Sequence, residues 1–417
     1  MHQLFGSPIH HLLRDLAKKY GALMHLKLGE TSTIVVTSPE MAREIYRTND
    51  IIFASRPSQS LAFKIFSFNF ADLIFSPYGN YWRQLRKICT MELLISLQKG
   101  STINLSRSIV SLTYSFTSRA AFGIRNDLET ERFIQRIDEL NGMASEFSLA
   151  DMCPSIKLLQ MMSTLRFKVE KLHKQIDEIL VNIVNEHKGK IKEAKQEGAE
   201  GKEDLVDVLL NIQKRGDFEP QLADTSIRAV ILDIFSAGSE TSSTAMEWAI
   251  SEMIKNPEIM KRAQHEVRNF YNDKGNADES HLHELKYLHA IIKETLRLHP
   301  TKAQIIVNAW AIGRDSNYWS EAEKFNPLRF LDSEIDYKGN NFEYIPFGAG
   351  RRICPGISFS QAVIELVLAQ LLFHFDWKLP GDLKPEEFDM VEKLGRTIRP
   401  QNDLLLIPIA YSGSCLT

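Results

Sequence analysis

One short segment near the end of the chain, PFGAGRRICPG at residues 346–356, constrains the fold more than any other. Its glycines allow the backbone to turn tightly and to approach a flat ligand closely, and a long apolar stretch typical of a buried helix follows at 362–375. Cys354 therefore precedes a helix N-terminus, where the helix dipole and free N–H groups favour a thiolate. A thiolate held against a large cofactor is a metal ligand, and Arg351 and Arg352 suit carboxylate groups on that cofactor.

Another interpretation of this segment stays open. A glycine-rich turn beside a buried free cysteine is the usual fate of a lone cysteine. A dinucleotide-binding loop is excluded, because Arg351, Arg352 and Ile353 follow the glycines and no strand-plus-acid context accompanies them. The other three cysteines are too few and too scattered for a disulfide framework.

Composition narrows the class of protein further. The chain has 417 residues, 44% of them hydrophobic, which is enough for a large buried core. Its 50 basic and 53 acidic residues give a net charge of -3, so nucleic acid is not expected as a partner. No run of 18 apolar residues predicts a membrane span, and the stretch at 362–375 is better interpreted as a core helix. A short amphipathic helix is expected after Ser7-Pro8 in place of a signal peptide.

Helical periodicity dominates the chain, and no βαβ rhythm occurs, so a doubly wound sheet is disfavoured. The longest helix is expected from about Asp224 or Thr225 to about Lys255, before Asn256-Pro257. The charged, glycine-containing stretch 187–204 predicts a surface linker between two helices. Strand character occurs in four stretches, namely 23–29, 33–38, 304–312 and 404–409. The sequence thus predicts a mainly α protein with a small β part.

The middle of the longest expected helix contains AGSETS at residues 237–242. On a helical wheel Ile234, Ala237, Thr241 and Ala245 share one face. The small residues at 237 and 238 leave that face open to the close approach of another group. Taken alone, the same pattern fits an ordinary helix whose small residues allow close packing.

Together these segments resemble the cytochrome P450 monooxygenases. The pattern Phe-x-x-Gly-x-Arg-x-Cys-x-Gly from Phe347 to Gly356 matches the haem-binding loop of that family. The resemblance implies a mainly α cytochrome P450 fold in a single domain over residues 1–417, haem b as cofactor, and Cys354 as the proximal iron ligand. The residues implied to lie against the haem are Ala237, Gly238, Phe347, Gly348, Gly350, Arg352 and Gly356.

The resemblance also implies a reaction. Thr241 would support proton delivery during oxygen activation, with Glu240 in a water-linked relay. Two electrons would come from NADPH through a flavoprotein, NADPH-cytochrome P450 reductase, and one atom of O₂ would enter a small apolar substrate. The basic patch of Arg83, Lys87 and Arg351 is either the face that docks this reductase or a plain solvated surface.

A further motif is ETLR, with Glu294 and Arg297 one turn apart on a helix. A surface ion pair is the default interpretation of such spacing, and it would contribute little to stability. In the family the pair is instead buried and joined by an arginine from a downstream loop, which here is Arg329 of FNPLRF. The family usually has glutamate where this chain has Leu328.

Two groups of residues are assigned by resemblance alone. Trp82 and Arg86, one helical turn apart, would contact a haem propionate together with Arg352. Substrate contacts are expected from five positions, namely Phe66, Phe70, Ala237, Leu394 and Thr397. The aromatic residues near 66–70 fit a plain apolar loop nearly as well.

The chain most resembles plant enzymes that oxidise terpenoids and related products of specialised (secondary) metabolism. Relative to the family, the N-terminal membrane anchor and internal segments after Leu94 and after Pro300 are expected to be missing. The family implies the cytosolic face of the endoplasmic reticulum membrane, with peripheral association for this chain. Two alternatives to a monooxygenase are a non-catalytic truncated relative with impaired haem binding and an O₂-independent haem-thiolate isomerase or dehydratase.

Two histidine pairs, His10-His11 and the pair at His281 and His283, are metal-ligand types without an evident third ligand. We expect both pairs to lie on the solvated surface.

Overall fold

The computed structural model describes residues 9–28, 31–49, 53, 64–65, 68, 104–122, 128–143, 164–197, 203–216, 219, 221–272, 277, 279–300, 307–381, 383–393 and 397–411. The α-helices in these ranges are α1 (Ile9–Tyr20), α2 (Pro39–Arg43), α6 (Leu105–Phe122), α7 (Leu128–Met143), α10 (Thr164–Glu197), α11 (Leu205–Arg215), α12 (Asp224–Lys255), α13 (Pro257–Tyr271), α14 (Lys286–Leu298), α15 (Ala309–Ile312) and α16 (Ile357–His374). The prediction of a mainly α protein is confirmed.

The β structure of the described residues consists of short antiparallel pairs. Strand β1 (Leu23–Leu28) pairs with β2 (Thr31–Val36), β3 (Phe375–Lys378) with β6 (Ile407–Ala410), and β4 (Glu392–Lys393) with β5 (Arg399–Pro400). The β4–β5 pair places Glu392 opposite Pro400. Three of the four predicted strand regions therefore carry strand structure.

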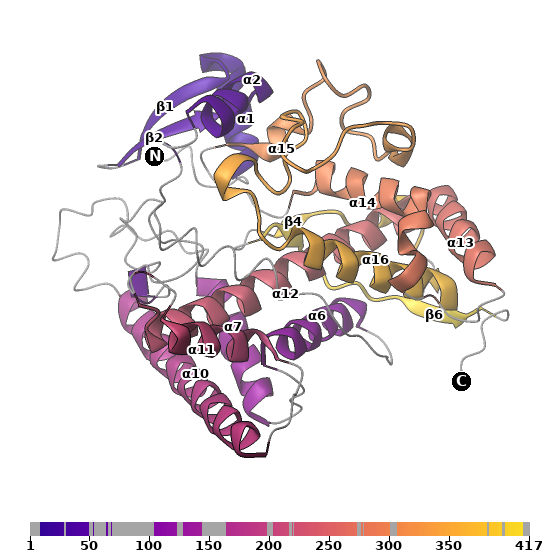
Figure 1. Ribbon diagram of the computed structural model, residues 1–417. Helices are drawn as coiled ribbons and strands as arrows, with labels where there is room; N and C mark the ends of the chain where they lie inside the picture. Colours follow the sequence, from indigo (N-terminus) through magenta and orange to yellow (C-terminus); the bar gives the residue numbers. More distant parts are fainter. Residues whose placement is uncertain are drawn as a thin grey trace.

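Helix α12 forms the axis of the molecule and is buried around most of its circumference, as expected for a helix that is apolar on all sides. It packs against α6 on one side and against α14 and α16 on another (Figure 1). The predicted bounds of this helix are confirmed, since it ends at Lys255 and Pro257 opens α13. One core cluster joins the second half of α12 with α13, α14 and α16, and another joins its first half with α6, α7, α10 and α11.

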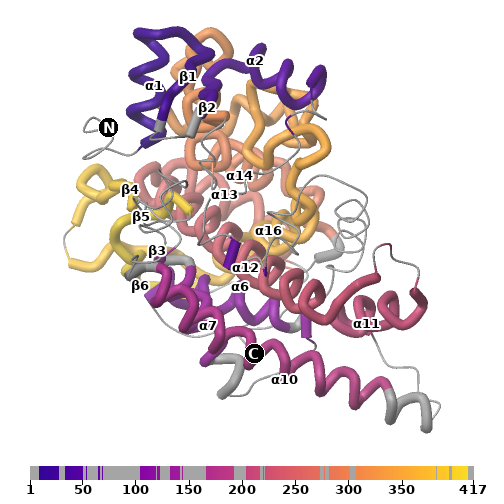
Figure 2. The backbone as a smooth tube through the Cα atoms, turned by 90° about the vertical axis from the view of Figure 1, so that its left-hand side faces the viewer, coloured from indigo at the N-terminus to yellow at the C-terminus, as the bar shows by residue number. Residues whose placement is uncertain are grey.

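Two groups of elements lie at opposite ends of the molecule. Helices α1 and α2 and strands β1 and β2 lie together beside α15, whereas α10 and α11 lie at the opposite end (Figures 1 and 2). Helix α1 is the amphipathic helix expected after Ser7-Pro8, and it buries His10 and Leu13. By length and composition α16 is the described helix that is apolar enough to cross a membrane, but 67% of that window is buried inside the fold. It is therefore a core helix, as the sequence predicts.

The expected strand at 304–312 is wrong over its second half. Residues 309–312 form the short helix α15, because the side chain of Asn308 accepts a hydrogen bond from the Ala311 amide and caps the turn. Strand-like pairing survives only at Val307, which forms an isolated parallel bridge with Val36. The residues from 301 to 306 lie outside the described ranges.

The expected linker at 187–204 is also wrong in part, because α10 continues to Glu197. The stretch consists mostly of good helix formers, and a single glycine at 189 does not end it. His187 is almost fully buried, and its Nε2 lies 2.9 Å from the carboxylate of Asp204, which caps α11. This contact anchors the last turns of α10 to the next helix.

Candidate active site

The loop at 346–356 turns tightly just before α16. Gly348 and Gly350 have φ angles of 73° and 64°, which disfavour other residues. The amide of Cys354 donates a hydrogen bond of 3.0 Å to the carbonyl of Phe347 and closes the loop. Gly356 then forms the N-cap of α16. The tight turn and the helix start were expected from the sequence, because glycine-rich turns and helix starts are local features.

Cys354 is a free thiol among the described residues and is partly exposed. Three apolar side chains of the same loop and the first turn of α16, those of Phe347, Ile353 and Phe359, are also only partly buried. A thiol next to incompletely covered apolar surface fits a flat, apolar cofactor that brings its own metal. Haem meets this description, and the two glycines keep side chains out of the turn. Arg352 is likewise half-buried in this loop.

The middle of α12 is bonded directly to the helix that follows the cysteine loop. Ser242 Oγ lies 3.1 Å from Ser360 Oγ in the first turn of α16. A Cβ added to Gly238 would lie 3.8 Å from Phe359 and 3.6 Å from Thr117 of α6. The two segments singled out in the sequence, AGSETS and the cysteine loop, are therefore brought together by the fold.

Thr241 and Glu240 lie side by side on α12 with different partners. The Thr241 hydroxyl donates 2.7 Å to the carbonyl of Ala237 inside the helix. The Glu240 carboxylate accepts a hydrogen bond of 2.8 Å from the hydroxyl of Thr397, which is 2% exposed. The Thr397 oxygen is also 3.4 Å from that of Thr244. Thr397 was expected to contact substrate, and the structure reveals a carboxylate partner that the sequence does not indicate.

The segment carrying Thr397 is fixed along α12 by a further contact. The indole Nε1 of Trp248, one helical turn beyond Thr244, donates 2.9 Å to the carbonyl of Ile398. The Trp248–Ile398 hydrogen bond thus holds Thr397 beside Glu240 on α12. Of the other expected substrate contacts, Ala237 lies half-buried on α12, whereas Phe66, Phe70 and Leu394 lie outside the described residues, as do Trp82 and Arg86.

Glu294, Arg297 and Arg329 form one buried cluster. Arg297 Nε and Nη2 donate 2.8 and 2.9 Å to the two carboxylate oxygens of Glu294, in the bidentate geometry that strengthens such pairs. Arg329 Nε donates 3.0 Å to the same carboxylate. The side chains of Glu294 and Arg297 are fully buried, so the default interpretation as a surface ion pair is wrong.

The cluster also collects backbone groups from the loops after α15. Arg297 donates to the carbonyls of Gly313, Ala322 and Lys324. The carboxylate of Glu294 accepts 2.8 Å from the amide of Asn326. These contacts fix the irregular chain from 313 to 329 onto α14, without help from a glutamate at Leu328.

Three buried groups were not found from the sequence. Burial raises the pKa of Glu247 on α12 to about 7, although Arg399 opposes the shift. His299 Nε2 lies 2.8 Å from Glu252, and its ring stacks on Trp248 with centroids 4.0 Å apart. His10 is 2% exposed, so its expected place on the solvated surface is wrong. A charged or imidazole residue in an apolar helix face is the one local signal that could have indicated these positions.

The fold and the site define a mainly α protein with a single cysteine ligand candidate before its last long helix. A family model described as Cytochrome P450 matches residues 1–101, 94–304 and 300–405. A zebra fish cytochrome P450 solved with progesterone has the same fold, with a TM-score of 0.80 and 23% identity over 97% of this chain and 100% of that one. The chain belongs to the cytochrome P450 family.

The relatives are plant enzymes. Tabersonine 16-hydroxylase 1 of Catharanthus roseus is 54% identical, covering 99% of this chain and 90% of that protein. Tabersonine 6,7-epoxidase isoform 1 of the same plant is 52% identical, with 100% and 90% covered. Premnaspirodiene oxygenase of Hyoscyamus muticus is 44% identical, with 99% and 91% covered. The protein is therefore a cytochrome P450 monooxygenase of the plant type.

The family match breaks at two places. Its three stretches meet at residues 94–101 and 300–304, next to the positions where segments are expected to be missing. The alignment with the 16-hydroxylase spans 458 residues, more than the 417 of this chain, so the relative has internal residues that this chain lacks. Both break points lie at or next to residues outside the described ranges, and the single-domain assignment over 1–417 stays a prediction.

Proposed function

We propose that this protein is a haem-thiolate monooxygenase that inserts one atom of O₂ into a small apolar substrate of specialised metabolism. The observation that carries the proposal is Cys354, a free thiol in a glycine-shaped loop ahead of α16. The Ser242–Ser360 contact bonds this helix to the middle of α12, next to Thr241. Electrons would come from NADPH through a flavoprotein reductase, as the family resemblance implies.

The residues that would hold haem b come from both segments. Cys354 would supply the sulfur that binds the iron, and a set of small or apolar residues would lie against the haem, namely Ala237, Gly238, Phe347, Gly348, Gly350 and Gly356. Arg352, with Trp82 and Arg86, would hold the propionates, because guanidinium groups pair well with carboxylates. When bound, the haem supplies O₂ activation and the transfer of one oxygen atom to the substrate.

Proton delivery is the role proposed for the α12 residues. The Thr241 hydroxyl would pass a proton toward the oxygen site, and the Glu240 carboxylate would exchange protons with solvent. The hydrogen bond from Thr397 holds one oxygen of Glu240 in place and leaves the other available for a proton. Thr397 is therefore proposed as a positioning residue for Glu240, in addition to its expected place near the substrate.

The buried cluster of Glu294, Arg297 and Arg329 is proposed to hold the scaffold of the cysteine loop. It ties the chain from 313 to 329 to α14, and Tyr344, just before the loop, donates 2.7 Å to the carbonyl of Lys293 on the same helix. Helix α14 thus holds two segments that precede Phe347 in the chain.

The substrate proposal starts from the relatives. Enzymes 44–54% identical to this chain are named for oxidising tabersonine and premnaspirodiene, so we propose these two compounds as the first test substrates, with terpenoids as the wider class. Purified protein with NADPH and a plant reductase would give a product that carries one atom from ¹⁸O₂. A product formed without O₂ would favour the isomerase or dehydratase alternative instead.

Thr241→Ala provides the mechanistic control for this experiment. We expect NADPH oxidation to continue while peroxide replaces the oxygenated product, because the Thr241 hydroxyl is no longer there to direct proton delivery. Equal product yield from Thr241→Ala and wild type would contradict the assigned role. A protein that takes up no haem would favour the truncated, non-catalytic alternative.

The cellular site is proposed from the family, at the cytosolic face of the endoplasmic reticulum membrane. A reductase in the same membrane would then meet its electron acceptor. Fractionation of plant cells that express a tagged chain would place it in microsomes. Recovery only in the cytosolic fraction would contradict the proposal.

A further inference from the structure

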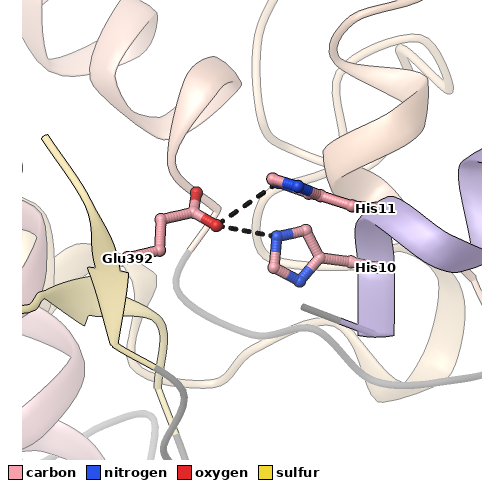
Figure 3. A group of neighbouring side chains, drawn as sticks. All are labelled: His10, His11 and Glu392. Carbon is pink, nitrogen blue, oxygen red and sulfur yellow. Dashed lines mark hydrogen bonds and ion pairs between the residues drawn. The ribbon is translucent and has the colours of Figure 1, made fainter. Parts of the chain in front are cut away.

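Three side chains from opposite ends of the sequence converge beside α1. Figure 3 shows the imidazole rings of His10 and His11 pointing from α1 toward the carboxylate of Glu392 on β4. His10 Nε2 lies 2.9 Å and His11 Nε2 lies 3.4 Å from the same oxygen, Glu392 Oε2. All three potential ligand atoms lie within 4.8 Å of one another. The cluster is separate from the cysteine loop and has no part in the proposed function.

The surrounding structure holds these side chains in position. The side-chain Nδ2 of Asn308 donates a hydrogen bond of 2.9 Å to the backbone carbonyl of His10, so the start of α1 is fixed to the chain ahead of α15. The ring centroid of Trp310 lies 4.2 Å from that of His11 and 5.0 Å from that of His10. Such packing restricts the rotamers of both imidazoles, and preorganised ligands bind a metal with a smaller loss of entropy.

Two imidazole nitrogens of the cluster, His10 Nδ1 and His11 Nε2, are buried without a hydrogen-bond partner among the described residues, and His11 Nε2 is the one that faces Glu392. The 3.4 Å contact of this nitrogen with Glu392 lacks hydrogen-bond geometry. A buried polar atom without a partner costs free energy. An ion placed between the imidazole and the carboxylate would give this nitrogen the partner that it lacks.

The acidic side chain of the cluster, Glu392, faces both imidazoles. A carboxylate beside two imidazole nitrogens favours a cation. The nearby guanidinium of Arg314 would repel a bound cation. Its charge is balanced by the carboxylate of Glu323, which lies 3.0 Å from Arg314 Nε.

We infer that His10, His11 and Glu392 form a binding site for a divalent transition-metal ion, with Zn²⁺ as the best fit. Two imidazoles and one carboxylate are a common zinc ligand set, with water in the fourth position. Ligands about 2.1 Å from a tetrahedral zinc ion lie roughly 3.4 Å apart. The His11–Glu392 separation of 3.4 Å matches this spacing. The His10–Glu392 separation of 2.9 Å is shorter, so His10 would give up its hydrogen bond to Glu392 when it binds the ion. Magnesium and calcium prefer oxygen ligands and fit less well.

A metal here would join the first described helix to the C-terminal part of the chain. Glu392 pairs across the β4–β5 ladder with Pro400, and Thr397, the partner of Glu240, lies in the same segment. The bound ion would therefore fix the outer end of the segment whose inner end contacts α12.

The test is direct zinc binding to the full-length protein. Protein stripped with a chelator is titrated with Zn²⁺ in competition with a chromophoric chelator, and bound zinc is counted by elemental analysis after gel filtration. We expect one zinc per chain, and an affinity at least about 100-fold lower for His11→Ala and Glu392→Gln. His11→Ala is the main variant because this side chain is 35% exposed, whereas the buried His10 could be needed for folding.

The chain offers a matched control in the other histidine pair. His281 and His283 lie two residues apart, and His281 Nδ1 is 3.0 Å from Glu284, but these groups are exposed. The double variant His281→Ala, His283→Ala should keep the zinc stoichiometry and affinity of wild type. The inference fails if wild type binds no zinc, or if His11→Ala and Glu392→Gln bind it as tightly as wild type does. In either case the cluster is only an ion pair.

Discussion

The hydroxyl of Thr397 donates a hydrogen bond to the carboxylate of Glu240 across 157 positions of sequence. The contact joins a buried residue of the C-terminal part to the central helix α12, next to Thr241. Trp248 holds the adjoining Ile398 carbonyl on the same helix, so the partner of Glu240 is set by packing and not by chance rotation. The orientation of the proposed proton donor therefore depends on a residue that is far away in the chain.

Thr397→Val should separate oxygen use from product formation. Valine keeps the shape of threonine but cannot donate to Glu240, so the carboxylate loses its orientation. We expect product formed per NADPH to fall by a factor of about ten, less than the roughly 100-fold expected from loss of a catalytic acid itself. Thr397→Ser, which keeps the hydroxyl, should restore the yield. An equal yield from Thr397→Val and wild type would show that the hydrogen bond has no part in proton delivery.

Glu294→Gln should destabilise the protein strongly, because it leaves two buried guanidinium groups without their carboxylate. Breaking a buried ion pair in this way typically costs about 3–5 kcal/mol. The matched control is Glu139→Gln, which breaks the Arg136–Glu139 pair at the same helical spacing and 2.7 Å but on the surface. That change should cost less than about 1 kcal/mol. Chemical denaturation of wild type, the two single variants and the double variant would measure the free energy of unfolding lost in each. Similar losses for Glu294→Gln and Glu139→Gln would contradict the account.

Gly348→Ala should destabilise the cysteine loop through the backbone alone. An added Cβ would meet no atom within 4 Å, so the cost of about 1–2 kcal/mol arises from the φ angle of 73°. Gly189→Ala is the control, since that Cβ also meets open space but the residue lies in α10. It should stabilise the protein by about 0.5–1 kcal/mol. Changes of the same sign in both variants, measured by urea denaturation, would disprove the backbone explanation.

Glu247→Gln should become more stable than wild type as the pH rises. The folded carboxyl has a pKa of about 7, whereas the unfolded one titrates near 4.5, so wild type loses stability between these pH values. Below pH 4.5 the carboxyl is protonated in both states and this penalty is absent. The full difference of about 3 kcal/mol is reached above pH 7, where glutamine avoids the buried charge. Denaturation at pH 5 and pH 8 tests this, and a pH-independent difference would contradict the shifted pKa.

Local signals predicted most of the fold. Helix α12 was expected from about Asp224 or Thr225 to about Lys255 because its helical pattern stops before Asn256-Pro257, and the structure has these bounds. Residues 309–312 were predicted to be strand because β-branched and aromatic residues surround them. They form a helix instead, which Asn308 caps and which packs beside α1. Short apolar stretches cannot be assigned from propensity alone, because tertiary contacts decide between helix and strand.

The candidate site divides in the same way. The cysteine loop and the Glu294–Arg297 pair are short motifs, so the sequence locates them directly. The partners of Glu240 and of His10 lie 157 and 382 positions away, and a single sequence carries no sign of such pairings. These long-range contacts are where the structure adds most to the proposed chemistry.

The central claim is that the sulfur of Cys354 would bind the iron of haem. The most direct measurement is the carbon monoxide difference spectrum of the reduced, haem-loaded protein, compared with Cys354→Ala and with Cys153→Ala as a cysteine control. The account predicts a Soret band at the long-wavelength position of thiolate-ligated haem in wild type and Cys153→Ala, and its loss in Cys354→Ala. A band at the position of nitrogen-ligated haem, unchanged when Cys354 is removed, would contradict it.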